Sequence, residues 1–390
     1  MNLISDQAER LLEKGFSRRQ LGRIAKLLTA GAGLPFYNEF AMAQEAQQRR
    51  GERGAGRAMD PDTVRINSNE NPMGPCKEGL EAIAKIAPLG WRYSAGNVTS
   101  ELTQAIAQTE DLKEDHIAVY AGSSDPLHRV ACAFTSPTQS WTMGDPGYGG
   151  GAPAFIGSKL NRVPLREDYS HDVEAMVKAD PNAGVYYLCN PNNPTGTLTA
   201  REDIEYLLAN KSKDAVVLVD EAYIHFSAKA KSCADLVAAG KDVIVLRTFS
   251  KIYGMAGLRA GFAMGRPDLL GKMRPYGVGF MQTGAVTGVA CAAASLRVKN
   301  LVAERRALNR SIREDTFAFL DKRGVKFIPS ETNFFMMEVN RPGNTFADAM
   351  AANKVIIGRV WPVWPTKVRV TVGSQDDMTK FKTAFEKAWA

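Results

Sequence analysis

The chain alternates short apolar runs with segments of helical pattern, and this alternation restricts its fold more than any other feature. Four runs, at residues 117–120, 184–188, 215–219 and 243–246, are rich in β-branched side chains. Such runs are typical of parallel strands that are buried on both faces. A segment between two of them, residues 200–210, has a helical pattern with Thr199 as its expected N-cap. We therefore predict an α/β fold whose mostly parallel central sheet is flanked by helices on both faces.

A second, smaller α+β domain is predicted toward the C-terminus. Residues 296–322 have the pattern of a long charged helix, and residues 325–328, 333–339 and 368–372 follow as strands. In chain order we expect a signal peptide at 1–43, a flexible linker at 44–62, an arm at 63–90 that joins the small domain, a large domain at 91–288 and the small domain at 289–390.

The first residues carry the parts of an export signal. Paired arginines, Arg18 and Arg19, precede a modestly apolar run at 27–36, and the small-residue site Ala41-Met42-Ala43 follows. This pattern resembles a twin-arginine (Tat) signal peptide, which implies a periplasmic protein whose mature chain begins at Gln44. The alternative is a basic amphipathic helix at the start of a cytoplasmic protein.

Charge and cysteine usage argue against several classes of protein. The formal net charge is +7, but the first 58 residues contribute +4 of it, so the body has no concentrated basic face for nucleic acid. The five cysteines are scattered and never form a C-x-x-C pair, which favours buried thiols over a disulfide framework or a metal site. No uninterrupted apolar stretch has the length that a membrane span requires.

Polar clusters follow the ends of all four predicted strands. They are Gly122-Ser123-Ser124 after the first run, Asn190 to Gly196 after the second, Asp220 to Tyr223 after the third, and Ser250-Lys251 with Arg259 after the fourth. Ligands of open α/β sheets bind at the carboxyl ends of the strands. The sequence therefore predicts that an amide, a carboxylate, a lysine, an arginine and a Gly-Ser turn converge on one site.

The order and spacing of these motifs resemble those of fold-type I enzymes that use pyridoxal 5'-phosphate (PLP), within the class I/II aminotransferase family. The nearest branch is histidinol-phosphate aminotransferase, and the resemblance runs from about Asn67 to about Gly373. It implies that the large domain binds PLP and that Lys251 forms a Schiff base with it. Asp220 would then pair with the pyridine nitrogen, and Tyr223 and Asn193 would hydrogen-bond the ring oxygen.

The same resemblance implies further cofactor contacts. The backbone of Ser123 and Ser124, the Ser250 hydroxyl and Arg259 match the phosphate cup, and Tyr148 matches the aromatic residue that stacks on the ring. Tyr93 matches a tyrosine that reaches the phosphate from a neighbouring subunit, so we expect a homodimer with shared active sites.

Two arginines match substrate-binding positions of the family. Arg369 would clamp the substrate α-carboxylate, and Arg359 would face the far end of the substrate, a phosphate in the histidinol-phosphate branch. The loop between them departs from the polar loop expected there, because it holds Trp361 and Trp364. These tryptophans either line a pocket for an aromatic or apolar side chain or pack the small domain.

We therefore expect a PLP-dependent aminotransferase that moves an amino group between an amino acid, or a histidinol-phosphate-like amine, and a 2-oxo acid. The alternative on the same scaffold is a PLP-dependent decarboxylase or lyase, because the reaction depends on which substrate bond stands perpendicular to the ring. A PLP-binding regulator is less favoured, since residues before 63 hold no helix-turn-helix of adequate length. A bare binding protein would not need Lys251 or Asp220.

Overall fold

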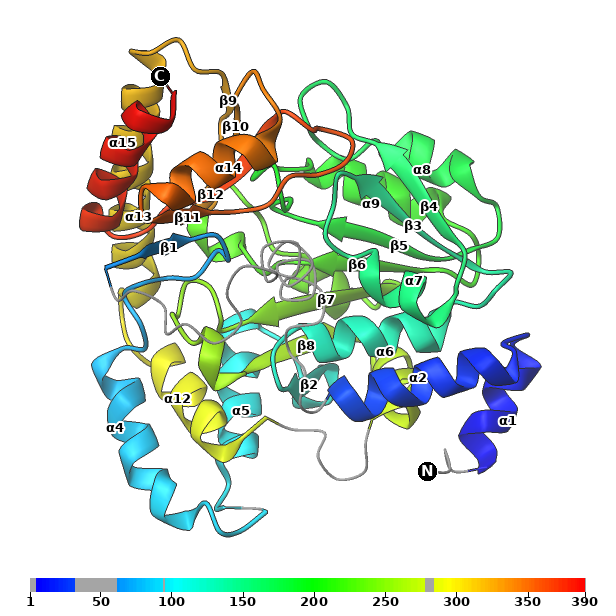
Figure 1. Ribbon diagram of the computed structural model, residues 1–390. Helices are drawn as coiled ribbons and strands as arrows, with labels where there is room; N and C mark the ends of the chain where they lie inside the picture. The colour runs from blue at the N-terminus through cyan, green and yellow to red at the C-terminus, as the bar shows by residue number, and fades with distance from the viewer. Residues whose placement is uncertain (1–4, 32–61, 94, 278–283, 390) are drawn as a thin grey trace.

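A seven-stranded sheet forms the centre of the computed structural model, which describes residues 5–31, 62–93, 95–277 and 284–389 (Figure 1). The strand order is β2-β8-β7-β6-β5-β3-β4. The strands are β2 (Ile117–Tyr120), β3 (Ser140–Asp145), β4 (Leu160–Pro164), β5 (Ala183–Cys189), β6 (Val216–Asp220), β7 (Val243–Thr248) and β8 (Gly261–Gly265). Only the pairs that involve β8 are antiparallel within this sheet. The predicted fold class and the four predicted strands of this sheet are confirmed, with ends that differ by at most two residues.

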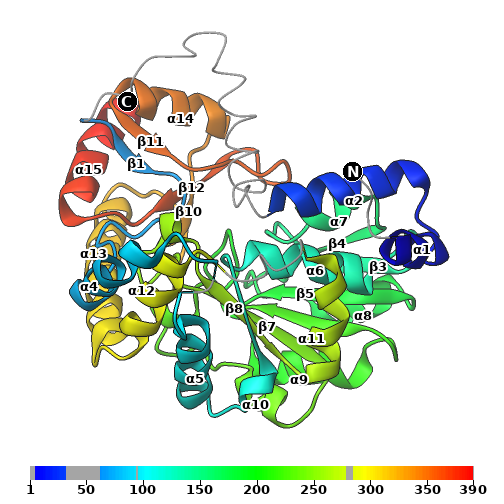
Figure 2. The same cartoon turned by 90° about the horizontal axis from the view of Figure 1, so that it is seen from below.

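Helices cover both faces of this sheet (Figures 1 and 2). They are α5 (Val98–Glu110), α6 (Ser124–Phe134), α7 (Gly151–Ile156), α8 (Val173–Ala179), α9 (Arg201–Asn210), α10 (Ala234–Ala238) and α11 (Pro267–Met273). The predicted N-cap at Thr199 is wrong, because α9 has Ala200 as its N-cap. Thr199 instead donates its backbone N–H to Asn190 Oδ1 at 3.0 Å and accepts one from His171 at 3.2 Å, so it closes the loop after β5.

A smaller α+β unit lies at one end of the sheet. Its strands β9 (Phe327–Ile328), β10 (Phe334–Glu338) and β12 (Lys367–Thr371) form an antiparallel sheet, and β1 (Val64–Ile66) pairs in parallel with β11 (Val355–Ile357). Its helices are α13 (Leu301–Asp321), α14 (Gly343–Ala352) and α15 (Gln375–Trp389). The predicted long helix begins at Leu301 rather than at residue 296, because Asn300 adopts a positive φ of 64° and separates α13 from α12 (Val286–Leu296).

Two apolar cores accompany the two units. Val64 and Ile66 of the arm pack in the smaller core with Phe335 and Phe385, whereas Val289 of α12 belongs to the larger core. Helix α12 also packs on α4 (Lys77–Ile86) and α5. Strand β1 of the arm thus packs with the smaller unit, whereas α4 packs on α12, and the domain boundaries stay a prediction.

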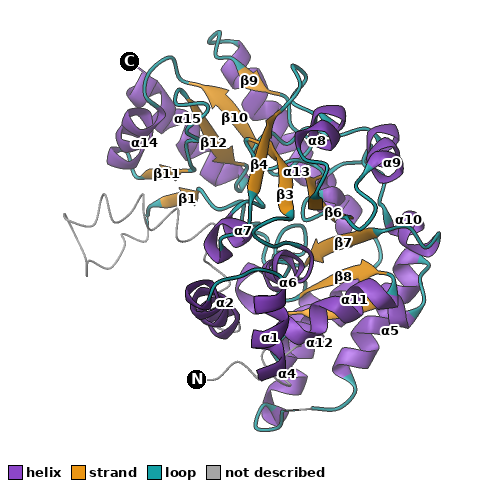
Figure 3. Ribbon diagram, turned by 90° about the vertical axis from the view of Figure 1, so that its right-hand side faces the viewer, coloured by secondary structure: helices purple, strands orange, loops and turns teal. Residues whose placement is uncertain are grey.

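Of two N-terminal helices, α2 (Arg18–Gly31) lies against α6 and α7, and α1 (Ser5–Glu13) packs on α2 (Figures 1 and 3). Leu11 and Ile24 are fully buried in the larger core. Lys14 Nζ donates to the carbonyl oxygens of Cys132 and Ala133, at 3.3 and 2.5 Å, in the last turn of α6. Cations are favourable at this end of a helix. The predicted cleavage site and the linker up to residue 61 lie outside the described residues.

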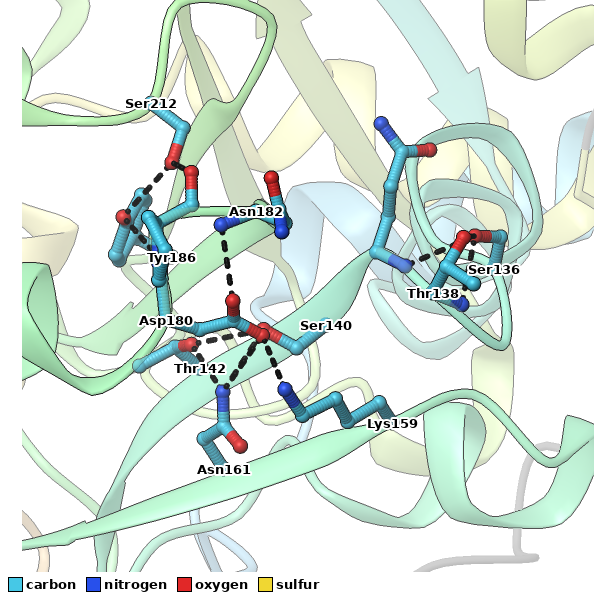
Figure 4. A network of polar contacts seen from close by, with 12 residues as sticks. Ser136, Thr138, Ser140, Thr142, Lys159, Asn161, Asp180, Asn182, Tyr186 and Ser212 are labelled. Atoms are coloured by element: carbon cyan, nitrogen blue, oxygen red, sulfur yellow. Dashed lines mark hydrogen bonds and ion pairs between the residues drawn. The ribbon is translucent and has the colours of Figure 1, made fainter.

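A polar network ties β3, β4 and β5 together at their amino-terminal ends (Figure 4). Asp180 accepts hydrogen bonds from Lys159 Nζ at 2.8 Å and from the backbone of Asn182 at 2.9 Å. Although burial opposes ionisation, these donors hold the pKa of Asp180 at about 2. The network therefore stays ionised and stabilises the sheet at the edge opposite to the carboxyl ends of these strands.

All five cysteines are buried. Among the described helices none is, by itself, long and apolar enough to cross a membrane, and one bent pair, α12 with α13, passes that test by length and composition only.

Candidate active site

The carboxyl ends of β5, β6 and β7 place the predicted residues next to one another. Cys189 at the end of β5 is in register with Asp220, and Asp220 is in register with Leu246 of β7. Asp220 is the last residue of β6, and Lys251 follows three residues after the end of β7. Lys251 is close enough for its charge to act on the Asp220 carboxyl group. The predicted convergence at the strand ends is therefore present.

Asp220 lies in a buried, hydrogen-bonded position. Its Oδ2 accepts from the Tyr187 hydroxyl at 3.0 Å, and its Oδ1 accepts from the backbone N–H of Ala222 at 3.1 Å. Burial raises the pKa of Asp220 to about 6, although the hydrogen bonds and the charge of Lys251 oppose that rise. A buried carboxylate of this kind is stabilised by a cationic partner.

Lys251 and Tyr223 face each other in front of this carboxylate. Lys251 Nζ lies 5.5 Å from the centre of the Tyr223 ring and donates to the backbone oxygen of Ser68 at 3.2 Å. The Tyr223 hydroxyl accepts a hydrogen bond from Asn69 Nδ2 at 3.0 Å. The arm that carries Ser68 and Asn69 thus closes one side of the site.

An anion cup lies beside the lysine. Arg259 Nη1 donates to Ser250 Oγ at 3.2 Å, and Nη2 donates to the oxygen of Ala121 at 3.4 Å. Helix α6 begins here, at Ser124 with Ser123 as its N-cap, and the first amide groups of a helix favour anions. Gly122 has a φ of +90°, which strains any other residue, and a Cβ there would lie 2.4 Å from Arg259 Nη2 and would displace the guanidinium.

The two tyrosines predicted to contact the cofactor, Tyr148 and Tyr93, differ in how far they are buried. Tyr148 is half-buried against the larger core, and it lies close enough to Arg259 and Tyr187 to influence the pKa of each. Tyr148 is therefore brought to the site. Tyr93 is 90 % exposed, and its contact with the phosphate of a neighbouring subunit stays a prediction.

Arg369 and Arg359 share one aromatic neighbour. Arg369 is 1 % exposed, and it donates to Asn193 Oδ1 at 2.7 Å and to the oxygen of Asn67 at 2.9 Å. Its guanidinium lies 5.6 Å from the Trp361 ring centre, and that of Arg359 lies 5.3 Å from the same ring. The two cations are therefore held around a single indole group.

The loop between Arg359 and Arg369 also packs against the rest of the protein through its two tryptophans. Trp361 is buried with Ile328 and Met336 of the smaller sheet. Trp364 meets Tyr169, which follows β4 of the large sheet, edge-on at 5.6 Å. Trp361 thus serves the packing of the small unit, and Trp364 connects the two units.

Sequence reasoning gave no role to Tyr187, Asn67 or Asn69, although the structure brings all three to the site. Tyr187 lies within a run that was interpreted as a buried strand, and only the pairing of β5 with β6 places it next to Asp220. Asn67 and Asn69 belong to a motif that carries the resemblance. Their contacts depend on the arm reaching residues more than 150 positions away.

The described residues fit PLP. A buried carboxylate, Asp220, suits a protonated ring nitrogen. Arg259, Ser250 and the start of α6 supply the cation and donors that a phosphate requires. Lys251 stands between these two sets as the amine, so the donor set matches the cofactor from end to end.

Comparisons with known proteins agree with this arrangement. The family model for aminotransferase class I and II matches residues 61–385. Histidinol-phosphate aminotransferase 1 of Nitrosococcus oceani is 31% identical over 374 residues, which cover 93% of this chain and 96% of the relative. Histidinol-phosphate aminotransferase 2 of Nitrosospira multiformis is 33% identical over 338 residues, 83% of each chain. The histidinol-phosphate aminotransferase of Sinorhizobium meliloti, solved in complex with pyridoxal-5'-phosphate, has a TM-score of 0.77 at 24% identity, with 88% of this chain and 94% of that chain covered.

Proposed function

This chain belongs to the aminotransferase class I and II family, and from that membership we propose roles for the residues at the carboxyl edge of its sheet. The protein is a PLP-dependent aminotransferase that moves an amino group between an amino acid, or a histidinol-phosphate-like amine, and a 2-oxo acid through a Schiff base on Lys251. When bound, PLP supplies an electron sink for the electrons of the substrate α-carbon. The position of Lys251 beside the buried carboxylate of Asp220 is the observation that carries this function.

The chain's own residues divide the work. Lys251 would hold PLP and would move the proton at the substrate α-carbon, and the oxygen of Ser68 at 3.2 Å is positioned to orient its amino group. Asp220 would pair with the protonated ring nitrogen, and Tyr187 holds the Asp220 carboxylate in place. Tyr223 and Asn193 would hydrogen-bond the ring oxygen. Arg369, which donates to Asn193, would bind the substrate carboxylate.

The test of this function is a visible absorption titration of the purified protein with a panel of amino acids and histidinol phosphate. A protonated lysine Schiff base of PLP is expected to absorb near ~420 nm, and a true amino donor should bleach this band. A band that shifts without bleaching would favour the decarboxylase or lyase alternative. A protein that shows no band after addition of PLP would contradict the proposal.

Replacing Arg359 with alanine should separate the classes of substrate. Arg359 is half-buried and lies over Trp361. We expect kcat/KM for phosphorylated or acidic substrates to fall roughly 30- to 100-fold, because a charge-assisted contact is lost, and apolar substrates to change little. Arg359→Lys is the matched control, since it keeps the charge without the planar fork. An equal loss for every substrate would mean that Arg359 serves packing instead.

We also propose that the protein works as a homodimer. Trp91 and Tyr93 are 72 % and 90 % exposed, and the guanidinium of Arg92 stacks on Trp91 at 3.9 Å. Large exposed aromatic side chains close together support a contact surface. Light scattering should give twice the mass of the chain, and Tyr93→Ala should weaken PLP binding. A monomer with full activity would exclude the shared site.

Export is the proposed route of this protein. Arg18 and Arg19 are exposed at the start of α2, so the arginine pair is accessible to a transport receptor. In a bacterial host, we expect the protein in the periplasmic fraction, shortened before Gln44, and retained in the cytoplasm when both arginines are replaced by lysine. A full-length cytoplasmic protein would contradict this proposal.

A further inference from the structure

We propose that Asn69 is a positioning residue of the reaction, which holds the Tyr223 hydroxyl as a donor toward the cofactor ring oxygen. This inference rests on the role of Tyr223 in the proposed function and adds the residue that orients it.

Three consecutive residues of the arm contact three residues of the site. The oxygen of Asn67 accepts from Arg369 at 2.9 Å, and the oxygen of Ser68 accepts from Lys251 at 3.2 Å. Asn69 contacts Tyr223 with its side chain, at 3.0 Å. The first two contacts use the backbone, so only the third depends on the identity of the arm residue.

The backbone of Asn69 is hydrogen-bonded to the smaller unit, while its side chain contacts Tyr223 of the larger core. Its backbone oxygen accepts from Asn333 Nδ2 at 3.1 Å, and its N–H donates to Thr371 Oγ1 at 2.9 Å. The residue is 0 % exposed and has a φ of +54°, a conformation that asparagine tolerates better than most side chains. Its placement is therefore built into the contact between the two units.

The Thr371 hydroxyl determines which way the Asn69 amide points. Because Thr371 Oγ1 accepts the backbone N–H of Asn69, its own proton is available to Asn69 Oδ1, which lies 3.1 Å away. The amide nitrogen must then face Tyr223, where it donates to the phenol oxygen. Tyr223 uses a lone pair in this contact, so the contact with Asn69 does not occupy its O–H.

A phenol that accepts one hydrogen bond becomes a stronger donor in another. Donation to the ring oxygen stabilises that oxygen as an anion, which is the partner of the unprotonated Schiff base. Asn69 should therefore lower the pKa of the Schiff base. The other charged groups around the phenol are Lys251 over its ring, Asp220 before it in the chain, and Arg369, which lies over Phe334, the edge-on neighbour of Tyr223.

The experiment is a spectrophotometric pH titration of the Schiff base in the PLP-loaded enzyme. We expect Asn69→Ala to raise its pKa by roughly half a unit to one unit, because the phenol loses its orienting donor. Asn69→Asp should raise it further, since a carboxylate accepts the phenol proton and its negative charge favours the protonated Schiff base. Met73→Ala, an exposed position later in the arm, is the control that should not shift the pKa.

Two further variants make the outcome decisive. Thr371→Val removes the hydroxyl that orients Asn69 and should raise the Schiff-base pKa even if Asn69→Ala folds poorly. Tyr223→Phe should raise it as well, and Asn69→Ala added to Tyr223→Phe should have no further effect. The inference is overturned if Tyr223→Phe shifts the pKa while the Asn69 and Thr371 variants match the wild type. A wild-type protein without a Schiff-base band would instead remove the proposed function itself.

Discussion

Replacement of Lys251 with alanine is expected to abolish turnover and the absorption band near ~420 nm together. In the proposed function Lys251 is the amine of the Schiff base and the group that moves the proton at the substrate α-carbon, so one substitution removes both roles. Loss of a positioned proton-transfer group costs up to about 10⁴-fold in rate, and loss of the Schiff base adds to this. Steady-state kinetics and the absorption spectrum of the PLP-loaded variant measure the two effects separately.

A matched control for this variant is Lys229→Ala, which removes a lysine whose side chain is 76% exposed and which pairs with Glu331 at the surface. It should keep both the band and the rate, because exposed ion pairs contribute little to stability. A small added amine should restore part of the Lys251→Ala rate, since it can take over proton transfer. Normal turnover by Lys251→Ala without any added amine would refute the assignment.

The strands that could be predicted are those whose own residues are apolar enough to indicate a buried strand. The predicted runs in β5, β6 and β7 are mostly Val, Ile, Leu and aromatic residues, so local composition alone indicates strands buried on both faces. Strands β3 (SWTMGD) and β8 (GFAMG) contain serine, threonine or glycine and were not predicted. Their place in the sheet is decided by pairing with neighbours, which a single local window does not contain.

The contacts of the site likewise fall into those that the sequence predicts and those that depend on distant segments. Asp220 and Lys251 follow predicted strands, and parallel strands bring their carboxyl ends to one edge, so their proximity could be predicted. The contact of Arg369 with Asn193 spans 176 positions, and that of Asn69 with Tyr223 spans 154. Both contacts need the arm and the smaller unit to fold back over the sheet edge, which no periodicity in the sequence specifies.

Replacement of Asp220 with asparagine should weaken PLP binding and reduce kcat roughly 10²- to 10³-fold, because a preorganised charge opposite the ring nitrogen is lost. Asparagine keeps the size of the side chain and an oxygen for the Tyr187 hydroxyl, which donates at 3.0 Å in the wild type. The loss would therefore report charge rather than packing. Asp220→Glu, which keeps the charge, should retain more activity than Asp220→Asn. Equal activity of the wild type and Asp220→Asn would exclude the electron-sink role.

The same substitution should stabilise the protein from which PLP has been removed. Burial raises the pKa of Asp220 to about 6, above its unfolded value of about 3.9, so the folded chain binds this proton more tightly than the unfolded chain does. The contribution of Asp220 to stability is therefore fully present below about pH 4 and is lost as the pH rises to about 6. At pH 8 the ionised carboxylate lowers the free energy of unfolding by up to about 3 kcal/mol, which Asp220→Asn should restore. Urea unfolding of the PLP-free wild type and of PLP-free Asp220→Asn between pH 4 and 8 measures this difference. If the free energy of unfolding of the two proteins changed with pH in parallel, ionisation of Asp220 would have no such cost. A variant that is more stable without PLP yet binds it less tightly would show that the site keeps an unfavourable buried charge for its cofactor.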